Sequence, residues 1–440
     1  MTDYAKRTKK QQFFRVFLAA LLMAALMTNL WSLSSVYADE EPDPNTVPVY
    51  SPYVAVYCTD TNTFLYDINA NEKVYPASTT KILTAIVAIE NGDLDQVIEV
   101  SENAVYGIDP SSSHIALDVG EKLTLEDALY GLLLASGNDC AVAIAEAVGG
   151  SVEEFSDMMN AKAKEIGCED SHFTNPHGLF DEDHYTTVHD LSLLMAYAVT
   201  LDTFVEISST VVHTIPKTNK QDKRELWNGH GMLKGKYAYY KPVICGKTGY
   251  ITESGFNLVT YGEKNGIHLI VAIAGSDQQS QDCSDTQALM EFYFNNYELT
   301  TVDIPEDAAE EIVVDEKTTI PTSVEAQQLN LLLPKGKDPG EVTYETVPAE
   351  GLARPIEKGD QVGELTVKLG DDTLTTLPVI AEKSFQVPGH ALKGILRNVM
   401  IALVIVIALI LILLLIAQIR RSKQRRRRQV LHTSGRRRRR

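Results

Sequence analysis

The sequence predicts an α+β fold in which an antiparallel sheet lies beside a cluster of helices. Residues 53–300 indicate this because strand-like runs occur at both ends of the segment and helical patterns fill its middle. The early strands are expected at 54–57 and 63–66. Residues 301–390 contain short alternating runs rich in Val, Thr, Pro and Gly, which indicate a separate small all-β domain.

The middle of the first segment carries the helical patterns. Helices are predicted there at residues 78–90, 124–134, 139–148, 152–166 and 188–199. A hairpin should follow, because Asn265-Gly266 lies between two apolar runs and Asn-Gly is a strong signal for a two-residue turn. An amphipathic stretch at 286–297 is also expected to be helical.

Residues 1–38 have the order of a secretory signal peptide. Basic residues precede an apolar run at 16–27, and Val36-Tyr37-Ala38 then offers a small-residue cleavage site. The alternative is an uncleaved anchor helix, and with either reading the chain after residue 38 faces outward. Residues 39–52 are polar and proline-rich, as expected of a linker.

The C-terminal end predicts a membrane anchor. Residues 399–417 are apolar and uncharged, and at 1.5 Å per residue they span about 28 Å, close to the ~30 Å hydrocarbon core. We therefore expect a transmembrane helix at 397–419. Residues 420–440 contain 12 of the 40 Lys and Arg residues, and such an excess marks a cytoplasmic tail that attracts anionic lipid. A nucleic-acid-binding arm is the alternative, and the adjacent membrane span disfavours it.

The charge is distributed unevenly along the chain. The formal net charge is −19, but residues 39–419 contain 23 Lys and Arg against 58 Asp and Glu, a charge of −35. This outward part should bind polyanions poorly, so nucleic acid is not an expected partner. An acidic substrate would need a local cationic site.

The cysteines give no metal-binding pattern. The chain has five, none of them in a C-x-x-C spacing, so we expect no metal site. The odd count in an exported chain leaves at least one free thiol, while the pairing of the others stays open. The residues are Cys58, Cys140, Cys168, Cys245 and Cys283.

The first motif with a chemical use is Ser78-Thr79-Thr80-Lys81, at the start of an apolar helix. A spacing of three places Ser78 and Lys81 on one helix face. A serine hydroxyl needs an adjacent base, and a lysine can act as one only where burial or cationic neighbours keep it neutral. The apolar sequence after Lys81 predicts such burial. Alone, the motif is weak evidence, and an ordinary helix start with a solvated lysine is the favoured interpretation.

Two further motifs follow in the same segment. Ser136-Gly137-Asn138 lies between two predicted helices, where its side chains either enter a cleft or simply cap a helix. Lys247-Thr248-Gly249 lies on or beside a strand edge. Its lysine offers a charge to a carboxylate, its threonine a donor, and its glycine room for a ligand backbone. Each motif alone is weak evidence.

Together the motifs form the ordered set S-x-x-K, S-x-N and K-T-G, which penicillin-binding proteins and class A β-lactamases share. From residue 53 to about 297 the sequence resembles low-molecular-mass penicillin-binding proteins of the serine-type D-alanyl-D-alanine carboxypeptidase family. The resemblance extends to 174–179, 184–187 and 255–259. It implies a penicillin-binding-protein/β-lactamase-like transpeptidase domain, followed by the small all-β domain and a C-terminal transmembrane helix.

The resemblance also implies roles for single residues. The implied catalytic residues are Ser78 as the acylated nucleophile, Lys81 as the general base, and Ser136 as the relay of a proton to the leaving D-alanine. The implied substrate-binding residues are Asn138, Lys247, Thr248, Gly249 and Tyr250.

Within the implied binding set, Asn138 would hold the substrate amide, while Lys247 and Thr248 would hold the terminal carboxylate. The backbone N–H groups of Ser78 and Tyr250 would form the oxyanion hole. No metal and no organic cofactor is implied. His184 lies in one of the matching segments, where we expect it to order its loop rather than to transfer protons.

The implied function is removal of the terminal D-alanine from peptidoglycan stem pentapeptides ending in D-Ala-D-Ala, with β-lactam antibiotics as inhibitors. The implied location is the bacterial cell membrane, with a single membrane pass, an extracellular catalytic domain and a cytoplasmic C-terminal tail. Preference for carboxypeptidase or endopeptidase substrates stays open.

Two alternatives remain at this point. A class A-like β-lactamase would need a second carboxylate to activate the deacylating water, and Glu169 and Asp170 are the acidic residues that precede the loop at 174–179. A catalytically silent penicillin-sensing or wall-binding protein is the other alternative, although the intact motifs argue against it.

Overall fold

A computed structural model of the chain describes residues 42–315, 318–353, 355–385, 397–413 and 416. The expected signal peptide and the basic tail lie outside these ranges. The chain forms two compact units. The first comprises residues up to Val302 together with Asn330–Pro339, and the second comprises Asp303–Leu329 together with the residues from Gly340 onward.

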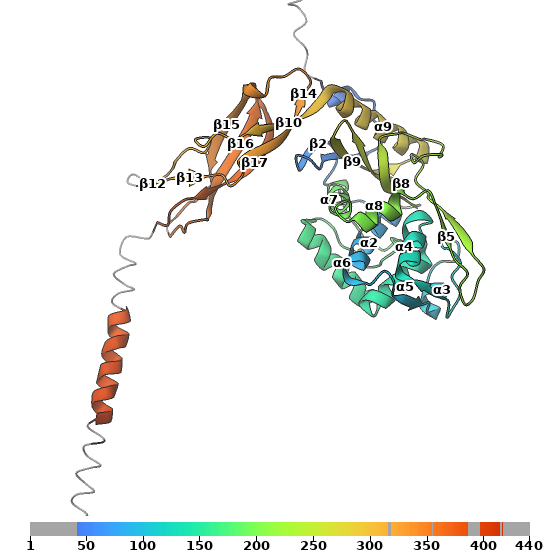
Figure 1. The fold of residues 1–440 in the computed structure, drawn as a ribbon, viewed down its shortest axis with the longest axis horizontal. Helices are drawn as coiled ribbons and strands as arrows, with labels where there is room; N and C mark the ends of the chain where they lie inside the picture. The colour runs from blue at the N-terminus through green and yellow to red at the C-terminus, as the bar shows by residue number, and fades with distance from the viewer. Residues whose placement is uncertain (1–41, 316–317, 354, 386–396, 414–415, 417–440) are drawn as a thin grey trace, which may run out of the picture. The chain divides into compact units, whose positions relative to one another are not determined.

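The first unit is built on a five-stranded antiparallel sheet with the strand order β2-β1-β9-β8-β7 (Figure 1). The predicted hairpin is confirmed, because Asn265 and Gly266 both have positive φ and connect β8 to β9. The strands are β1 (Tyr53–Cys58), β2 (Thr63–Ile68), β7 (Val243–Ile251), β8 (Gly255–Lys264) and β9 (Ile267–Ser276).

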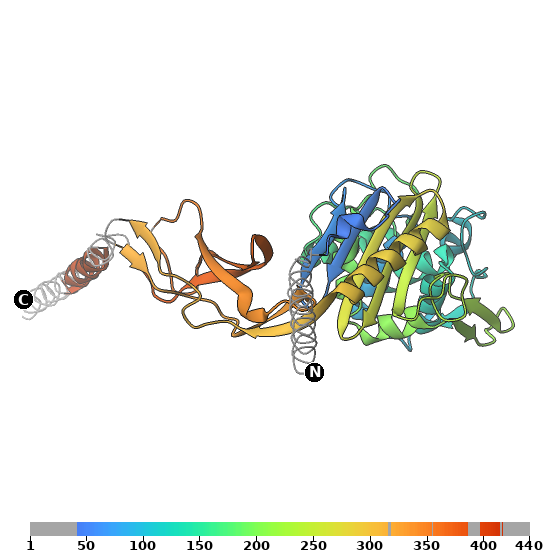
Figure 2. The same cartoon turned by 90° about the horizontal axis from the view of Figure 1, so that it is seen from above.

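Helices cover both faces of this sheet. Figure 2 shows α9 lying across one face and the other helices behind the opposite face. The helical elements are η2 (Ala77–Thr80), α2 (Lys81–Asn91), α3 (Glu102–Tyr106), α4 (Leu125–Leu134), α5 (Asn138–Gly149), α6 (Val152–Ile166), α7 (Val188–Ala198), α8 (Asp202–Ser209) and α9 (Gln279–Asn296). The predicted α+β class is confirmed.

Two cores result from the alternation of side chains along the strands. On β9, Ile270 and Ala272 pack with the helical cluster, whereas Val271 and Ile273 pack with α9 residues such as Leu289. This is the two-residue period expected of a strand that is buried on both faces. The same alternation decides which side chains of β7 face the helical cluster.

Several short elements were not predicted. They include α3 and α8 and two small antiparallel strand pairs, β3 (Val97–Glu99) with β4 (Lys122–Thr124), and β5 (Val212–Ile215) with β6 (Arg224–Trp227). Elements of three to eight residues carry too little periodicity to be recognised. Helix α9 begins at Gln279 rather than near residue 286, because its first turns are polar and lack an apolar pattern.

The boundary between the units differs from a single cut at residue 300. Strand β10 (Tyr297–Asp303) pairs with β14 (Gln328–Pro334), so a segment of the expected β domain returns to the first unit. The segment returns because burial of Leu332 in the core beneath α9 stabilises it against the first unit.

The second unit is all β, as predicted. A four-stranded sheet has the order β13-β17-β16-β15, and β11 pairs with β12. Apolar residues including Ile320, Val362 and Leu365 form its core. Its strands are β11 (Ile312–Asp315), β12 (Thr318–Ile320), β13 (Thr322–Ser323), β15 (Val342–Pro348), β16 (Gln361–Leu369) and β17 (Asp372–Ala381).

The transmembrane helix predicted at 397–419 is described only in part. Within the described ranges, no single helix has both the length and the apolarity of a membrane crossing. A shorter apolar helix occupies Arg397–Leu413. Helices α7 and α8 reach the length and apolarity of a membrane crossing only when they are taken together, and this pair is bent by 106°.

Candidate active site

Ser78 lies in a tight turn that leads into α2. The turn is the 3₁₀ helix η2, so Ser78 precedes the α-helix instead of beginning it as predicted. Ala77 has a φ of 49°, a region that non-glycine residues occupy at a cost of about 1–3 kcal/mol and most often at functional sites. The turn leaves Ser78 partly exposed, whereas Thr79 and Thr80, which follow it in the same turn, are fully buried.

Lys81 is fully buried beside the serine. Its Nζ lies 3.0 Å from Ser78 Oγ, 2.6 Å from Asn138 Oδ1 and 2.6 Å from the carbonyl oxygen of His177. Burial, with a further contribution from the charge of Lys247, holds the pKa of Lys81 well below its usual value. Burial therefore favours the neutral form of the amine. In that form its two N–H groups donate to the two carbonyl oxygens and leave its lone pair for the hydroxyl of Ser78.

Ser136 and Asn138 come from the connection between α4 and α5. The capping alternative is wrong, because Gly137 occupies the N-cap of α5 and no side chain caps that helix end. Asn138 instead donates through Nδ2 to Ser112 Oγ at 2.9 Å while its Oδ1 accepts from Lys81. Ser136 has a φ of 59°, a second strained residue at the site.

Lys247 reaches Ser136 from the edge strand β7. Its Nζ donates to Ser136 Oγ at 3.1 Å and to the carbonyl oxygen of Thr248 at 2.7 Å. Lys247 shares its face of β7 with Cys245, which packs in the helical-cluster core. Burial lowers the pKa of Lys247 to about 7, so its charge near neutral pH depends on what binds beside it.

Gly249 brings β7 against the nucleophile turn. A Cβ at this position would lie 2.9 Å from the Pro76 carbonyl oxygen and 3.1 Å from the backbone nitrogen of Ser78. Any side chain would therefore push the strand away from the turn. Position 249 therefore requires glycine because the strand passes close to the Ser78 turn. This reason adds to the predicted one, that glycine leaves room for the backbone of a ligand.

The side chains surround a cavity of about 280 Å³. The predicted residues among its lining are Ser78, Ser136, Thr248, Gly249 and Tyr250. The cavity is also lined by Ser113, Phe256, Asn257, Gln279 and Asp282. Lys81 and Lys247 contact the lining serines Ser78 and Ser136, and Asn138 contacts Lys81. The structure thus brings all the predicted site residues together.

The loop at 174–179 supports Lys81 through its backbone. The carboxamide oxygen of Asn175 accepts from the N–H groups of His177 and Gly178, at 3.3 Å and 2.7 Å, which fixes the loop carrying the His177 carbonyl. His184 is buried, bonds Thr80 Oγ1 through Nε2 at 2.8 Å, and accepts from a backbone N–H through Nδ1. Burial lowers the pKa of His184 to about 3. These contacts are those of a neutral residue that orders the loop.

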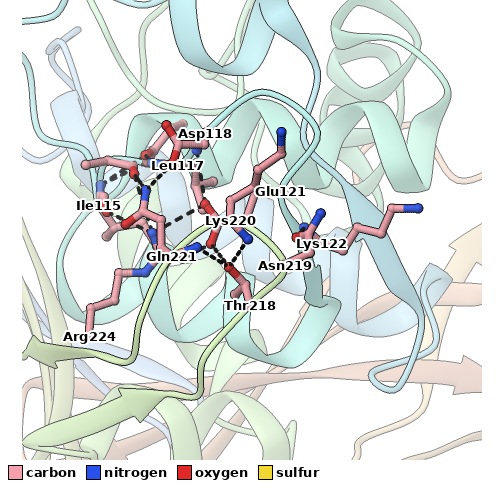
Figure 3. A network of polar contacts seen from close by, with 12 residues as sticks. Ile115, Leu117, Asp118, Glu121, Lys122, Thr218, Asn219, Lys220, Gln221 and Arg224 are labelled. Atoms are coloured by element: carbon pink, nitrogen blue, oxygen red, sulfur yellow. Dashed lines mark hydrogen bonds and ion pairs between the residues drawn. The ribbon is translucent and has the colours of Figure 1, made fainter.

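A polar network lies in the segment that follows the cavity residue Ser113. Figure 3 shows the tip of the β5–β6 hairpin bonded to the segment at 115–122. The fully buried carboxylate of Glu121 pairs with Arg224 and accepts from Thr218 Oγ1 at 2.9 Å. Breaking such a pair would leave a buried charge uncompensated. The network therefore fixes the segment that follows Ser113.

The acidic residues considered for a β-lactamase lie away from the cavity. Glu169 and Asp170 are both exposed and neither lines it. The loop presents the carbonyl of His177 to Lys81, where a deacylating carboxylate would be needed. Within the described residues, no group of three or more His, Cys, Asp or Glu side chains could hold a metal ion.

Some residues of the site were not predicted. They are Ser112 and Ser113 in a loop, the carbonyl of His177, and Gln279 and Asp282 at the start of α9. No local pattern could have identified them, because they reach the cavity only through contacts between segments distant in the sequence. The Ser111-Ser112-Ser113 run was the only local signal, and such runs are common in surface loops.

Comparison with known proteins gives the same assignment as the geometry. The family model for D-alanyl-D-alanine carboxypeptidases matches residues 50–278. The chain belongs to the D-alanyl-D-alanine carboxypeptidase family. The C-terminal domain of penicillin-binding protein 5 matches residues 308–386, most of which belong to the second, β-rich unit.

Relatives of this carboxypeptidase cover most of its length. It is 29% identical to the D-alanyl-D-alanine carboxypeptidase DacF of Bacillus subtilis over 75% of this chain and 84% of the relative. It is 30% identical to a D-alanyl-D-alanine carboxypeptidase of Streptomyces sp. K15 over 53% of this chain and 84% of the relative.

Solved structures agree on the fold. The Streptomyces K15 DD-transpeptidase aligns with a TM-score of 0.52 at 28% identity, over 56% of this chain and 97% of that one. Penicillin-binding protein 5 of Haemophilus influenzae aligns with a TM-score of 0.62 at 24% identity, over 77% of this chain and 98% of that one.

Proposed function

We propose that this serine D-alanyl-D-alanine carboxypeptidase works through an acyl-enzyme on Ser78, with Lys81 as the general base. The observation that carries the proposal is the 3.0 Å contact between Ser78 Oγ and the fully buried Nζ of Lys81. Since burial favours the neutral amine, it can accept the hydroxyl proton as the serine oxygen attacks the carbonyl of the penultimate D-alanine.

The developing oxyanion would be held by backbone N–H groups of Ser78 and Tyr250. The close passage of β7 at Gly249 past the Ser78 nitrogen supports this pairing of strand and turn. Collapse of the tetrahedral intermediate breaks the C–N bond, and the leaving amine of D-alanine takes a proton. Ser136 is suited to relay that proton because its hydroxyl contacts Lys247 and lines the cavity.

The remaining residues would position the substrate. Lys247 and Thr248 are proposed to bind its terminal carboxylate, and a bound carboxylate would favour the charged form of Lys247. Asn138 is proposed to hold the substrate amide through the carboxamide that it already orients against Lys81 and Ser112. Water then attacks the acyl-enzyme with the same lysine as base.

The natural substrates on this proposal are peptidoglycan stem peptides ending in D-Ala-D-Ala, and β-lactam antibiotics are inhibitors. The exposed positions of Glu169 and Asp170 support slow release of a lactam, because neither can activate a deacylating water from there.

Mass spectrometry after incubation with penicillin tests the proposed roles. We expect the protein to gain one penicillin on the peptide that contains Ser78. Ser78→Ala should abolish labelling, and Lys81→Ala should slow it by several orders of magnitude. Ser113→Ala is the matched control, since that serine lines the same cavity without a lysine contact. Rapid turnover with no trapped adduct would assign the chain to the β-lactamases.

We further propose that the chain is anchored in the bacterial membrane through 397–419, with residues 39–396 outside and 420–440 in the cytoplasm. The apolar run, the basic tail and the leader sequence support this topology. The β-rich unit would then act as a spacer. Protease added to intact spheroplasts should digest the catalytic unit and spare a C-terminal epitope. Loss of that epitope would reverse the topology.

A further inference from the structure

Asp282 is a buried carboxylate in the wall of the active-site cavity. It lies in the first turn of α9, is 1% exposed, and lines the cavity together with Gln279 and Tyr250. Within the described residues, neither of its carboxylate oxygens has a hydrogen-bond partner, and no ion pair reaches it. A buried carboxylate without partners costs several kcal/mol, so its presence in a binding cavity needs an explanation.

The neighbouring carboxylate on the same helix shows what a structural role looks like. Asp285 is equally buried, and its Oδ2 accepts from the N–H groups of Tyr50 and Ser51 at 3.0 Å and 2.9 Å and from Ser51 Oγ at 2.7 Å. It ties the N-terminal segment to α9. The first turn of a helix favours an acid, but an exposed acid would gain the same benefit. Asp282 makes no structural tie like that of Asp285, and the helix dipole does not require burial, so neither reason explains why Asp282 is buried.

The position of α9 places Asp282 at a particular part of the cavity. Along β7, Lys247 and Gly249 face the helical cluster, so Thr248 and Tyr250 point to the opposite face, which α9 covers. Phe256 on β8 packs against Tyr250, with ring centroids 4.5 Å apart, and lines the same cavity as Asp282. Asp282 therefore lies on the Thr248 side of the edge strand.

That side is where the proposed function places the terminal residue of the substrate. We propose that Asp282 selects this residue by charge, favouring a terminal D-amino acid with a cationic side chain and disfavouring an anionic one. The inference rests on the proposed binding of the terminal carboxylate by Lys247 and Thr248. A carboxylate that is only 1% exposed is poorly screened by solvent and acts over several ångströms, so a cation need not touch it to gain from its charge.

The titration of Asp282 is consistent with an unpaired position. Burial raises its pKa to about 7; the thiol and N–H of Cys283 oppose this shift, and the charge of Asp285 adds to it. Tyr237 is a further titratable group that interacts with Asp282. A cation bound in the cavity would lower this pKa, and the preference for cationic substrates should therefore grow as the pH rises above 7.

Four synthetic substrates test the proposal with the full-length enzyme. They share a diacetyl-L-lysyl-D-alanyl group and end in D-alanine, D-lysine, D-norleucine or D-glutamate. D-norleucine matches the length of lysine without its charge. At pH 8 we expect kcat/KM for the D-lysine peptide to exceed that for the D-norleucine peptide on the order of tenfold, with D-glutamate below both. Raising the salt concentration should shrink the differences.

Two variants attribute the effect to this carboxylate. Asp282→Asn should bring the D-lysine to D-norleucine ratio close to one, whereas Asp277→Asn, which removes an exposed carboxylate near the start of α9, should preserve it. Equal kcat/KM values for the D-lysine and D-norleucine peptides with the unmodified enzyme would overturn the inference. The proposed function would still stand in that case, provided that the enzyme hydrolyses the D-alanine peptide. Failure to hydrolyse any of the peptides would overturn both.

Discussion

Lys247 Nζ and Ser136 Oγ lie 3.1 Å apart although the residues are separated by 111 positions in the sequence. The contact joins the edge strand of the sheet to the connection between α4 and α5. It also places the charge of Lys247 close enough to lower the pKa of Lys81. On the proposed mechanism the two lysines need opposite protonation states, with Lys81 neutral as the base and Lys247 charged as the carboxylate site.

The pH dependence of kcat/KM should report this requirement. The pKa of Lys247 is lowered to about 7 by burial, so its charged form declines as the pH rises through that value. Lys247→Arg replaces it with a group that stays charged, because the arginine pKa exceeds 12. We expect the alkaline limb of the kcat/KM profile to move upward by at least one pH unit in this variant.

The measurement is hydrolysis of a diacetyl-lysyl-D-alanyl-D-alanine peptide between pH 5 and 10. The acid limb belongs to Lys81, so it should move little or downward when the neighbouring charge becomes permanent. An alkaline limb that stays in place in Lys247→Arg would show that another group controls it.

Gly178 should be intolerant of a side chain. Its φ is +83°, and a Cβ there would overlap the carbonyl oxygen of Ala77 in the nucleophile turn. Gly178→Ala should displace the His177 carbonyl from Lys81 and slow penicillin acylation on the order of a hundredfold. Gly167→Ala is the matched control, since Gly167 has a φ of +101° with no atom within 4 Å of its Cβ position. Equal acylation rates in the two variants would contradict the clash.

The parts of the site that were predictable are those defined by local sequence. The Ser78–Lys81 spacing, the Asn265-Gly266 turn and the placement of Lys247 on an edge strand all follow from short-range rules, and the structure contains each of them. The 3₁₀ turn at Ser78 was missed because a tight turn and a first helical turn have the same residue preferences.

The unpredicted parts depend on contacts between distant segments. Asp282 enters the cavity because α9 packs across β8 and β9, and nothing in its local sequence marks it as unpaired. Leu332 returns to the first unit for a similar reason, since its burial beneath α9 cannot be recognised without the sheet. Periodicity identifies which face of an element is buried, but not which element covers it.

The cysteines should all be reduced and unreactive. Each of the five is free and buried, which resolves the pairing that the sequence left open. Burial also raises the pKa of Cys245 and of Cys283 to about 12, so neither forms a thiolate near neutral pH. Ellman's reagent should label no thiol in the native enzyme and all five in urea. A reductant that lowers the melting temperature would reveal a disulfide and contradict this prediction.

Acid should destabilise the first unit through buried histidines. His184 and His230 are 2% and 1% exposed, and burial lowers the pKa of each from 6.5 to about 3. The unfolded chain therefore binds more protons than the native state between about pH 3 and 6.5. Stability must fall as the pH is lowered through this window, by up to about 1.4 kcal/mol per pH unit for each histidine.

Denaturant unfolding between pH 4 and 8, followed by the fluorescence of Trp227 in the first unit, measures this slope. His230→Gln removes one titrating group, so the free energy of unfolding should depend less steeply on pH below 6.5, even if the lost hydrogen bond to Thr260 lowers stability at pH 8. His114→Gln is the control, because His114 is exposed and its removal should leave the slope unchanged. An unchanged slope in His230→Gln would mean that the buried imidazole is already protonated in the native enzyme.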